Sequence, residues 1–204
     1  MDPHSPLRSP APEPGADDLP PPLAPQDRRV LRAIALESIE SGLASGRPLQ
    51  VLAESYSPAL REPGAAFVTL KSGGRLRGCV GSLQARRALV EDVAHNAFAA
   101  AFRDSRFPPL SRSELPILDL HISRLTPPTP LPARSREELL GAVLPGVDGL
   151  VLEDPPYRAT FLPQVWEALP DPRQFLAELC LKAGLAPDHW SETLRWFRYR
   201  VEEF

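Results

Sequence analysis

The sequence contains little cysteine, little lysine and no long hydrophobic run. Its two cysteines, Cys79 and Cys180, are too few for a disulfide framework or a four-cysteine zinc site. No apolar stretch approaches the ~20 residues that a membrane-spanning helix needs, and no apolar signal segment is visible near the N-terminus. We therefore expect a cytoplasmic protein that enters no membrane and needs neither a metal nor a cofactor.

A large excess of charge of either sign is absent as well. The 204 residues carry a formal net charge of −3, with 24% charged and 43% hydrophobic residues. This balance is typical of a globular domain. It argues against a protein held to nucleic acid or to an anionic membrane mainly by charge.

Proline is abundant but unevenly spread. Nine of the 26 prolines lie in the first 25 residues, and no aromatic residue precedes Tyr56. Proline fixes φ and removes a backbone donor, so this stretch favours neither a helix nor a sheet. We predict a disordered, Pro-rich tail over residues 1–25 and one domain over residues 26–204. A species-specific extension explains the tail better than a ligand for an SH3-type domain does.

The rest of the chain alternates between helix and strand signals. Asp27, Ser135 and Asp171 are predicted to cap helices, and Gly73-Gly74 to turn one strand into the next. The patterns predict helices at 28–45, 87–103, 136–144 and 172–183, and strands at 66–70, 75–83, 117–125, 149–153, 157–162 and 194–201. Hairpins mixed with irregularly placed helices favour an α+β fold with a largely antiparallel sheet and flanking helices.

The segment from Leu76 to Gly81 carries the clearest chemical signal. On a strand Arg77 and Cys79 share one face, where a guanidinium would favour the thiolate form of the cysteine. Gly78 and Gly81 leave the sulfur uncrowded or let a ligand approach closely. The same pattern also fits a buried cysteine that packs as a small hydrophobe.

The register of the hairpin bears on this choice. A two-residue loop places Cys79 opposite Val68, and a three-residue loop places it opposite Phe67. The sequence leaves both registers open.

Other polar residues are candidates for binding. Asn96 lies on a polar stripe of an alanine-rich helix, and Asp104 with Arg106 precedes a rigid proline loop. Arg103 and Arg106 could hold a carboxylate or phosphate, or an internal pair of Asp104 with an arginine could fix the loop. Thr160 and Gln164 could satisfy local backbone groups or face a pocket.

The C-terminal segment 195–200 interleaves arginines with aromatic residues, a pattern that is typical of single-strand nucleic-acid binding. Strand alternation divides these residues between two faces, so we expect an amphipathic edge strand. Nucleic acid is a possible partner but not the favoured one.

At these motifs the sequence resembles the AMMECR domain family, also called AmmeMemoRadiSam system protein A. Leu76-Arg77-Gly78-Cys79-Val80-Gly81 resembles the family signature Leu-Arg-Gly-Cys-Ile-Gly. Three further segments match in order, at residues 103–110, 159–166 and 175–190. Two positions depart from the pattern, since Val80 replaces isoleucine and Ser105 stands where proline is common.

The resemblance implies a two-lobed domain with a cleft, and it covers the chain from about residue 26 to the end. It also implies association with a Memo-like protein and a radical S-adenosylmethionine protein. For activity it implies either catalysis or nucleic-acid binding. The family's motif positions fall on Arg77, Gly78, Cys79, Gly81, Asn96, Arg106, Phe107, Thr160 and Gln164.

Three functions follow as hypotheses. The favoured one is a component of a cysteine-dependent enzymatic or modification system, with Cys79 as nucleophile or redox thiol and Arg77 as its activator. Asn96 and Arg106 would then anchor the substrate. The alternatives are a binding module for a small molecule, peptide or RNA, and an adaptor for the two partner proteins.

Overall fold

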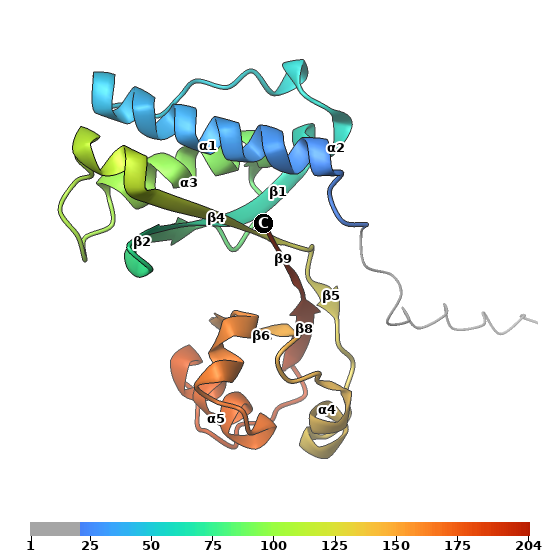
Figure 1. The fold of residues 1–204 in the computed structure, drawn as a ribbon. Coiled ribbons are helices and arrows are strands. Elements are labelled where there is room, and N and C mark those ends of the chain that lie inside the picture. Colours follow the sequence, from blue (N-terminus) through green and yellow to red (C-terminus); the bar gives the residue numbers. More distant parts are fainter. Residues whose placement is uncertain (1–20) are drawn as a thin grey trace, which may run out of the picture.

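The computed structural model describes residues 21–204, which form two lobes (Figure 1). Most of the predicted tail, residues 1–20, lies outside the described residues. Leu23, however, is buried in the first lobe, and its backbone N–H donates to the Glu202 carboxylate. Helix α1 then begins at Pro25. Leu23 thus joins the core three residues before the predicted start of the domain at residue 26.

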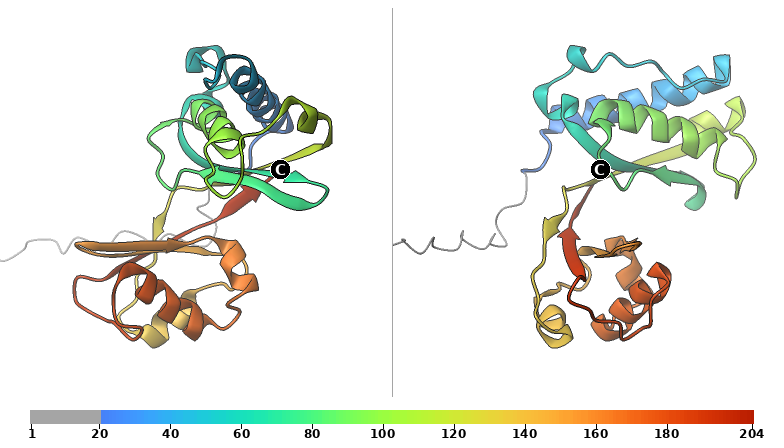
Figure 2. Two further views of the ribbon diagram at one scale, coloured as in Figure 1. Left: turned by 90° about the vertical axis from the view of Figure 1, so that its left-hand side faces the viewer. Right: turned by 180° about the vertical axis from the view of Figure 1, so that it is seen from behind.

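The first lobe carries its helices on one face of an antiparallel sheet, and the other face turns toward the second lobe (Figure 2). The sheet order is β2-β1-β4-β9, and the short strand β3 pairs with β1. The elements are α1 (Pro25–Ser45), α2 (Pro58–Arg61), β1 (Pro63–Ser72), β2 (Arg75–Gly81), β3 (Arg87–Ala88), α3 (Leu89–Phe102), β4 (Leu118–Leu125) and β9 (Val201–Glu203), with 3-10 turns at Ala53–Ser55 and Arg112–Ile117.

The second lobe contains a smaller antiparallel sheet of order β5-β8-β6-β7, packed against two helices. Its elements are β5 (Thr129–Pro130), α4 (Arg136–Ala142), β6 (Gly149–Asp154), β7 (Tyr157–Phe161), a 3-10 turn (Pro163–Glu167), α5 (Pro172–Ala183) and β8 (Arg195–Tyr199). The predicted caps of α4 and α5 are confirmed, since Ser135 and Asp171 accept backbone hydrogen bonds there.

The architecture confirms the predicted α+β fold with antiparallel sheets, but two local predictions are wrong. Ala24 precedes α1 and Pro25 is its first residue, so Asp27 is not the cap. Instead, the Asp27 carboxylate accepts a hydrogen bond from the Ser57 hydroxyl at 2.8 Å. The short elements α2, β3 and β5 were not predicted, because two to four residues are too few to show a periodicity.

The predicted single strand at 194–201 is also wrong. The chain forms β8 inside the second sheet, passes Arg200, and returns to the first lobe as β9. The other crossing follows β4, and the two crossings are tied together at Thr126. Its N–H donates to the Arg200 carbonyl at 2.9 Å, and its hydroxyl accepts from the Arg200 N–H at 2.9 Å.

A small apolar cluster joins the lobes, and we call it the interlobe cluster. It consists of Ala65, Leu125, Val151 and Tyr199, with the partly buried Phe67, Leu162, Phe197 and Val201 against them. Each lobe contributes half of these residues, so the lobes share buried apolar surface in addition to their two covalent links. Among the helices of residues 21–204, none is long and apolar enough to cross a membrane.

Candidate functional site

Cys79 lies in a cleft between the lobes with a volume of about 330 Å³, which we call the Cys79 cleft. One wall is the helix-free face of the first sheet, and the other is the turn after β7. The first lobe contributes Phe67, Thr69, Lys71, Cys79, His121, Ser123 and Glu203, and the second contributes Leu162, Gln164 and Glu167. The thiol is half-buried there, so the interpretation of Cys79 as a fully buried core residue does not hold.

The register of the hairpin matches neither predicted alternative. The loop has two residues, but Leu70 pairs with Gly78 while Lys71 pairs with Leu76, which leaves Arg77 as an extra residue. This bulge shifts Cys79 opposite Thr69. A bulge changes the strand's alternation, and a prediction from loop length alone cannot include it.

The shift places Cys79 in one row with Thr69 and His121 on three adjacent strands. The Thr69 hydroxyl donates to the Cys79 sulfur at 3.4 Å. His121 lies two strands from Cys79, a separation of ~10 Å, so its ring cannot bond the thiol directly. The His121 Nε2 lies 2.8 Å from the Asp119 carboxylate, and this hydrogen bond lowers the pKa of Asp119.

The backbone of Cys79 is held from outside the sheet. Strand β2 is an edge, so the outward N–H and C=O of Cys79 have no strand partner. Asp104 accepts from that N–H at 2.9 Å, and an Arg106 Nη donates to the C=O at 3.2 Å. Asp104 and Arg106 also pair with each other at 2.7 Å, and this bond is the main cause that holds the pKa of Asp104 far below its usual value. The Asp–Arg pair therefore fixes its own loop and covers the strand edge.

Arg77 is paired with Glu114 rather than with the thiol. Its Nε lies 2.6 Å from a Glu114 oxygen, and this bond is the main cause that lowers the pKa of Glu114 to about 2. The Phe107 ring lies beside both guanidinium groups, with centroids 6.0 Å from Arg77 and 5.5 Å from Arg106. Within residues 21–204 no hydrogen bond joins Arg77 to Cys79. Arg77, the predicted activator, therefore forms its ion pair with Glu114 and not with the Cys79 thiolate.

Asn96 is buried on the helix side of the sheet, so the structure does not bring it to the Cys79 cleft. Its amide donates to the Ala66 carbonyl at 3.0 Å and to the Asp92 carboxylate at 2.9 Å. Asp92 accepts in turn from the Ala66 N–H and the Ser82 hydroxyl, and burial raises the pKa of Asp92. Asn96 thus ties α3 to the backbone of β1 where pairing with β2 ends.

Gly78 and Gly81 serve packing. A Cβ at Gly78 would overlap the Ala100 carbonyl of α3, and one at Gly81 would overlap the Phe67 ring. Both positions therefore need the absence of a side chain, with no ligand required to explain it.

The last two predicted residues differ from each other. Thr160 donates to the Leu150 carbonyl at 2.8 Å and lies 3.1 Å from the Tyr199 hydroxyl, which fits the backbone-satisfying interpretation. Gln164 faces the Cys79 cleft, where its amide donates to Glu203 at 2.7 Å.

Eight of the ten residues that line the Cys79 cleft were not predicted as site residues, and the polar ones are Thr69, Lys71, His121, Ser123, Glu167 and Glu203. Alternation along the first strand could have placed Thr69 and Lys71 on one face. No local signal could have placed Glu203, because its strand belongs to the far end of the chain. The row that His121 forms with Cys79 depends on strand order, which no local pattern shows.

Comparisons with known proteins agree with this architecture. A family model described as AMMECR1 matches residues 32–204. A protein of Methanothermobacter thermautotrophicus is 35% identical over 189 residues, covering 90% of this chain and 96% of the relative. Protein MJ0810 of Methanocaldococcus jannaschii is 36% identical over 174 residues, covering 81% and 83%. The crystal structure of an uncharacterized protein, PH0010 from Pyrococcus horikoshii, matches with a TM-score of 0.71 and 34% identity, covering 85% of this chain and 88% of that one.

Proposed function

This chain belongs to the AMMECR1 family, and from that premise we propose that it is the substrate-handling component of a cysteine-dependent enzymatic or modification system. The observation that carries the proposal is the half-buried Cys79 thiol in a cleft whose polar side chains come from both lobes. A core cysteine needs no such surroundings. Convergent polar groups around a nucleophile in a concave site are the usual marks of chemistry.

The role of each group follows from its chemistry. A thiolate is the reactive form of cysteine, and the Thr69 hydroxyl stabilises that charge by donating to the sulfur. Lys71 and His121 can bind an anionic oxygen of a substrate, while Gln164 and Glu203 can bind an amine or hydroxyl group. The substrate we propose is therefore a small polar molecule or a peptide segment that carries both kinds of group.

The Memo-like protein and the radical S-adenosylmethionine protein remain proposed partners, and they rest on the family resemblance alone. In this proposal they would supply the substrate to the Cys79 cleft or receive its product.

A binding module without catalysis is the second candidate. It is favoured by the engagement of Arg77 with Glu114 and of Asn96 with Asp92, which removes a predicted activator and a predicted substrate anchor from the Cys79 cleft. In that case Cys79→Ser would preserve ligand affinity, whereas it would abolish turnover by an enzyme.

The first test is alkylation by iodoacetamide over a pH series, with mass mapping of the two cysteine peptides. Cys180 is an internal control, because it is 0% exposed and burial raises the pKa of its thiol. We expect Cys79 to react in the native protein and Cys180 only after unfolding. If neither cysteine reacts before unfolding, Cys79 is structural and the proposal fails.

A pair of variants then separates activation from mere exposure. Thr69→Val removes the hydroxyl beside the sulfur with little change of shape, and we expect it to slow Cys79 alkylation at neutral pH about threefold. Ser123→Ala is the matched control, since Ser123 lines the same cleft but makes no hydrogen bond with the sulfur. Equal rates in all three proteins would indicate an exposed but unactivated thiol, and they would favour the binding module.

A further inference from the structure

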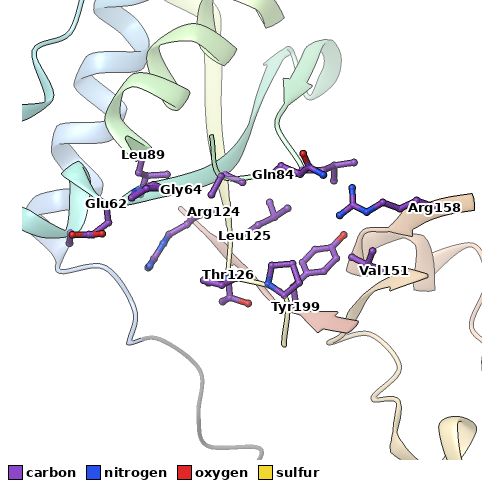
Figure 3. A pocket seen from close by; sticks show the side chains of 17 residues that line it. Glu62, Gly64, Gln84, Leu89, Arg124, Leu125, Thr126, Val151, Arg158 and Tyr199 are labelled. Carbon is purple, nitrogen blue, oxygen red and sulfur yellow. The ribbon is translucent and has the colours of Figure 1, made fainter. Parts of the chain in front are cut away.

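A second and larger pocket lies between the lobes, and it shares no lining residue with the Cys79 cleft. Its volume is about 500 Å³ (Figure 3). We propose that this pocket, which we call the Tyr199 pocket, binds an organic anion with a flat apolar body, of the class of aromatic carboxylates and sulfonates. The proposal is independent of any chemistry at Cys79.

The apolar walls of the Tyr199 pocket are suited to contact the flat apolar body of the proposed ligand. Four buried residues of the interlobe cluster, Ala65, Leu125, Val151 and Tyr199, line it from both lobes. The Tyr199 hydroxyl donates to the Phe161 carbonyl at 3.0 Å, so the ring has only apolar surface left to offer. A largely apolar cavity at a junction between lobes, with few polar groups, is the usual form of a small-molecule site.

The charged residues that line the pocket are suited to bind the anionic group of the proposed ligand. Two arginines line it, Arg124 and Arg158, against a single carboxylate, Glu62. Arg124 is already paired with Glu202 at 3.2 Å. Arg158 bonds Glu153 only through Nε, at 2.7 Å, and within residues 21–204 its two Nη groups have no hydrogen-bond partner. These groups can donate in parallel to a carboxylate or sulfonate.

The placement of Arg158 gives the anion its position in the pocket. Figure 3 shows the Arg158 guanidinium extending from the second lobe toward Gln84 of the first. Glu62 lies on the far side, beyond Arg124, and does not compete for Arg158. A ligand with its ring on Tyr199 and Val151 would thus place its charge between Arg158 and the Gln84 amide.

The test compares two fluorescent probes that differ by one charge. 1-Anilinonaphthalene-8-sulfonate has a flat apolar body and a sulfonate, and N-phenyl-1-naphthylamine has the same body without the charge. We expect Arg158→Gln to weaken binding of the sulfonate about tenfold and to leave the neutral probe unchanged. Ala85→Trp, at an exposed position of the pocket rim, should weaken both probes about tenfold or more by filling the space.

Two controls match these variants. Glu153→Gln breaks the same ion pair as Arg158→Gln but keeps the arginine, so it should not weaken sulfonate binding. Cys79→Ser should also leave the binding of both probes unchanged, which separates this site from the Cys79 cleft.

Two outcomes would contradict the proposal. If folded Ala85→Trp protein binds both probes as tightly as wild type, the probes do not bind in the Tyr199 pocket. If Arg158→Gln weakens the binding of both probes equally, the pocket has no preference for an anionic ligand. Far-UV circular dichroism confirms that each variant is folded.

Discussion

At the scale of single residues, the two strongest sequence motifs bind one another. Asp104 and Arg106 form hydrogen bonds with the backbone N–H and C=O of Cys79. Glu114, a few residues further along the chain, forms an ion pair with Arg77. These four charged residues therefore hold the edge strand in place. The position of the thiol in the Cys79 cleft depends on this support, because an unsupported edge strand is free to fray.

Glu114 gives this support a pH dependence. Hydrogen bonds from Arg77 and Ser111 lower its pKa from the ordinary value of 4.5 to about 2. A depressed carboxyl pKa adds stability above pH 4.5 and loses it as the pH falls toward 2. We expect Glu114→Gln to lower the free energy of unfolding at pH 7 by about 1 kcal/mol, since the pair is partly exposed. The measurement is urea unfolding between pH 2 and pH 7.

The slope of this dependence is the decisive observation. Wild-type protein should lose stability more steeply than Glu114→Gln over that acid range. The exposed Glu37 of α1 has no hydrogen-bond or ion-pair partner within residues 21–204, so Glu37→Gln is the control and should keep the wild-type slope. Identical slopes in all three proteins would contradict the pairing.

At the scale of elements, the distance between α3 and β2 depends on Gly78. The backbone of β2 approaches the Ala100 carbonyl so closely that no Cβ fits between them. This approach leaves the opposite face of β2, with Cys79, turned toward the second lobe. The buried Asp92 and Asn96 bond α3 to β1 next to it. Strand and helix are thus joined by a steric requirement and by a buried polar cluster.

A pair of glycine substitutions tests the steric requirement. We expect Gly78→Ala to lower the free energy of unfolding by about 2–3 kcal/mol, because the helix or the strand must move. Gly141 lies in α4 with open space around its Cβ position, so Gly141→Ala should raise stability by about 0.5 kcal/mol. Thermal and urea unfolding measure both. A Gly78→Ala protein as stable as wild type would refute the close approach.

At the scale of the whole molecule, the interlobe cluster determines how far the lobes behave as one unit. Val151 belongs to that cluster, whereas Val143, equally buried, belongs to the core of the second lobe. All three tryptophans lie in the second-lobe segment, and the two longest helices, α1 and α3, lie in the first lobe. Fluorescence and far-UV circular dichroism therefore report mainly on different lobes.

Matched valine substitutions in these two places test the coupling. Each should cost about 2 kcal/mol by leaving a cavity. We expect Val143→Ala to shift the fluorescence and dichroism transitions together. Val151→Ala should separate them, because it weakens the contact between the lobes. Coincident transitions in Val151→Ala would mean that the two chain crossings at Thr126 and Arg200 suffice for coupling.

The α+β class, the major helices and hairpins, and the caps of α4 and α5 could be predicted from the sequence, because they follow from local periodicity and backbone preference. The sequence also singled out Cys79 and Gln164, both of which line the Cys79 cleft. The bulge at Arg77, the pairing of Arg77 with Glu114 and the burial of Asn96 became visible only in the three-dimensional fold. The division of the last strand at Arg200 between two sheets likewise became visible only there. These features depend on partners far away in the chain, and a local pattern does not contain them.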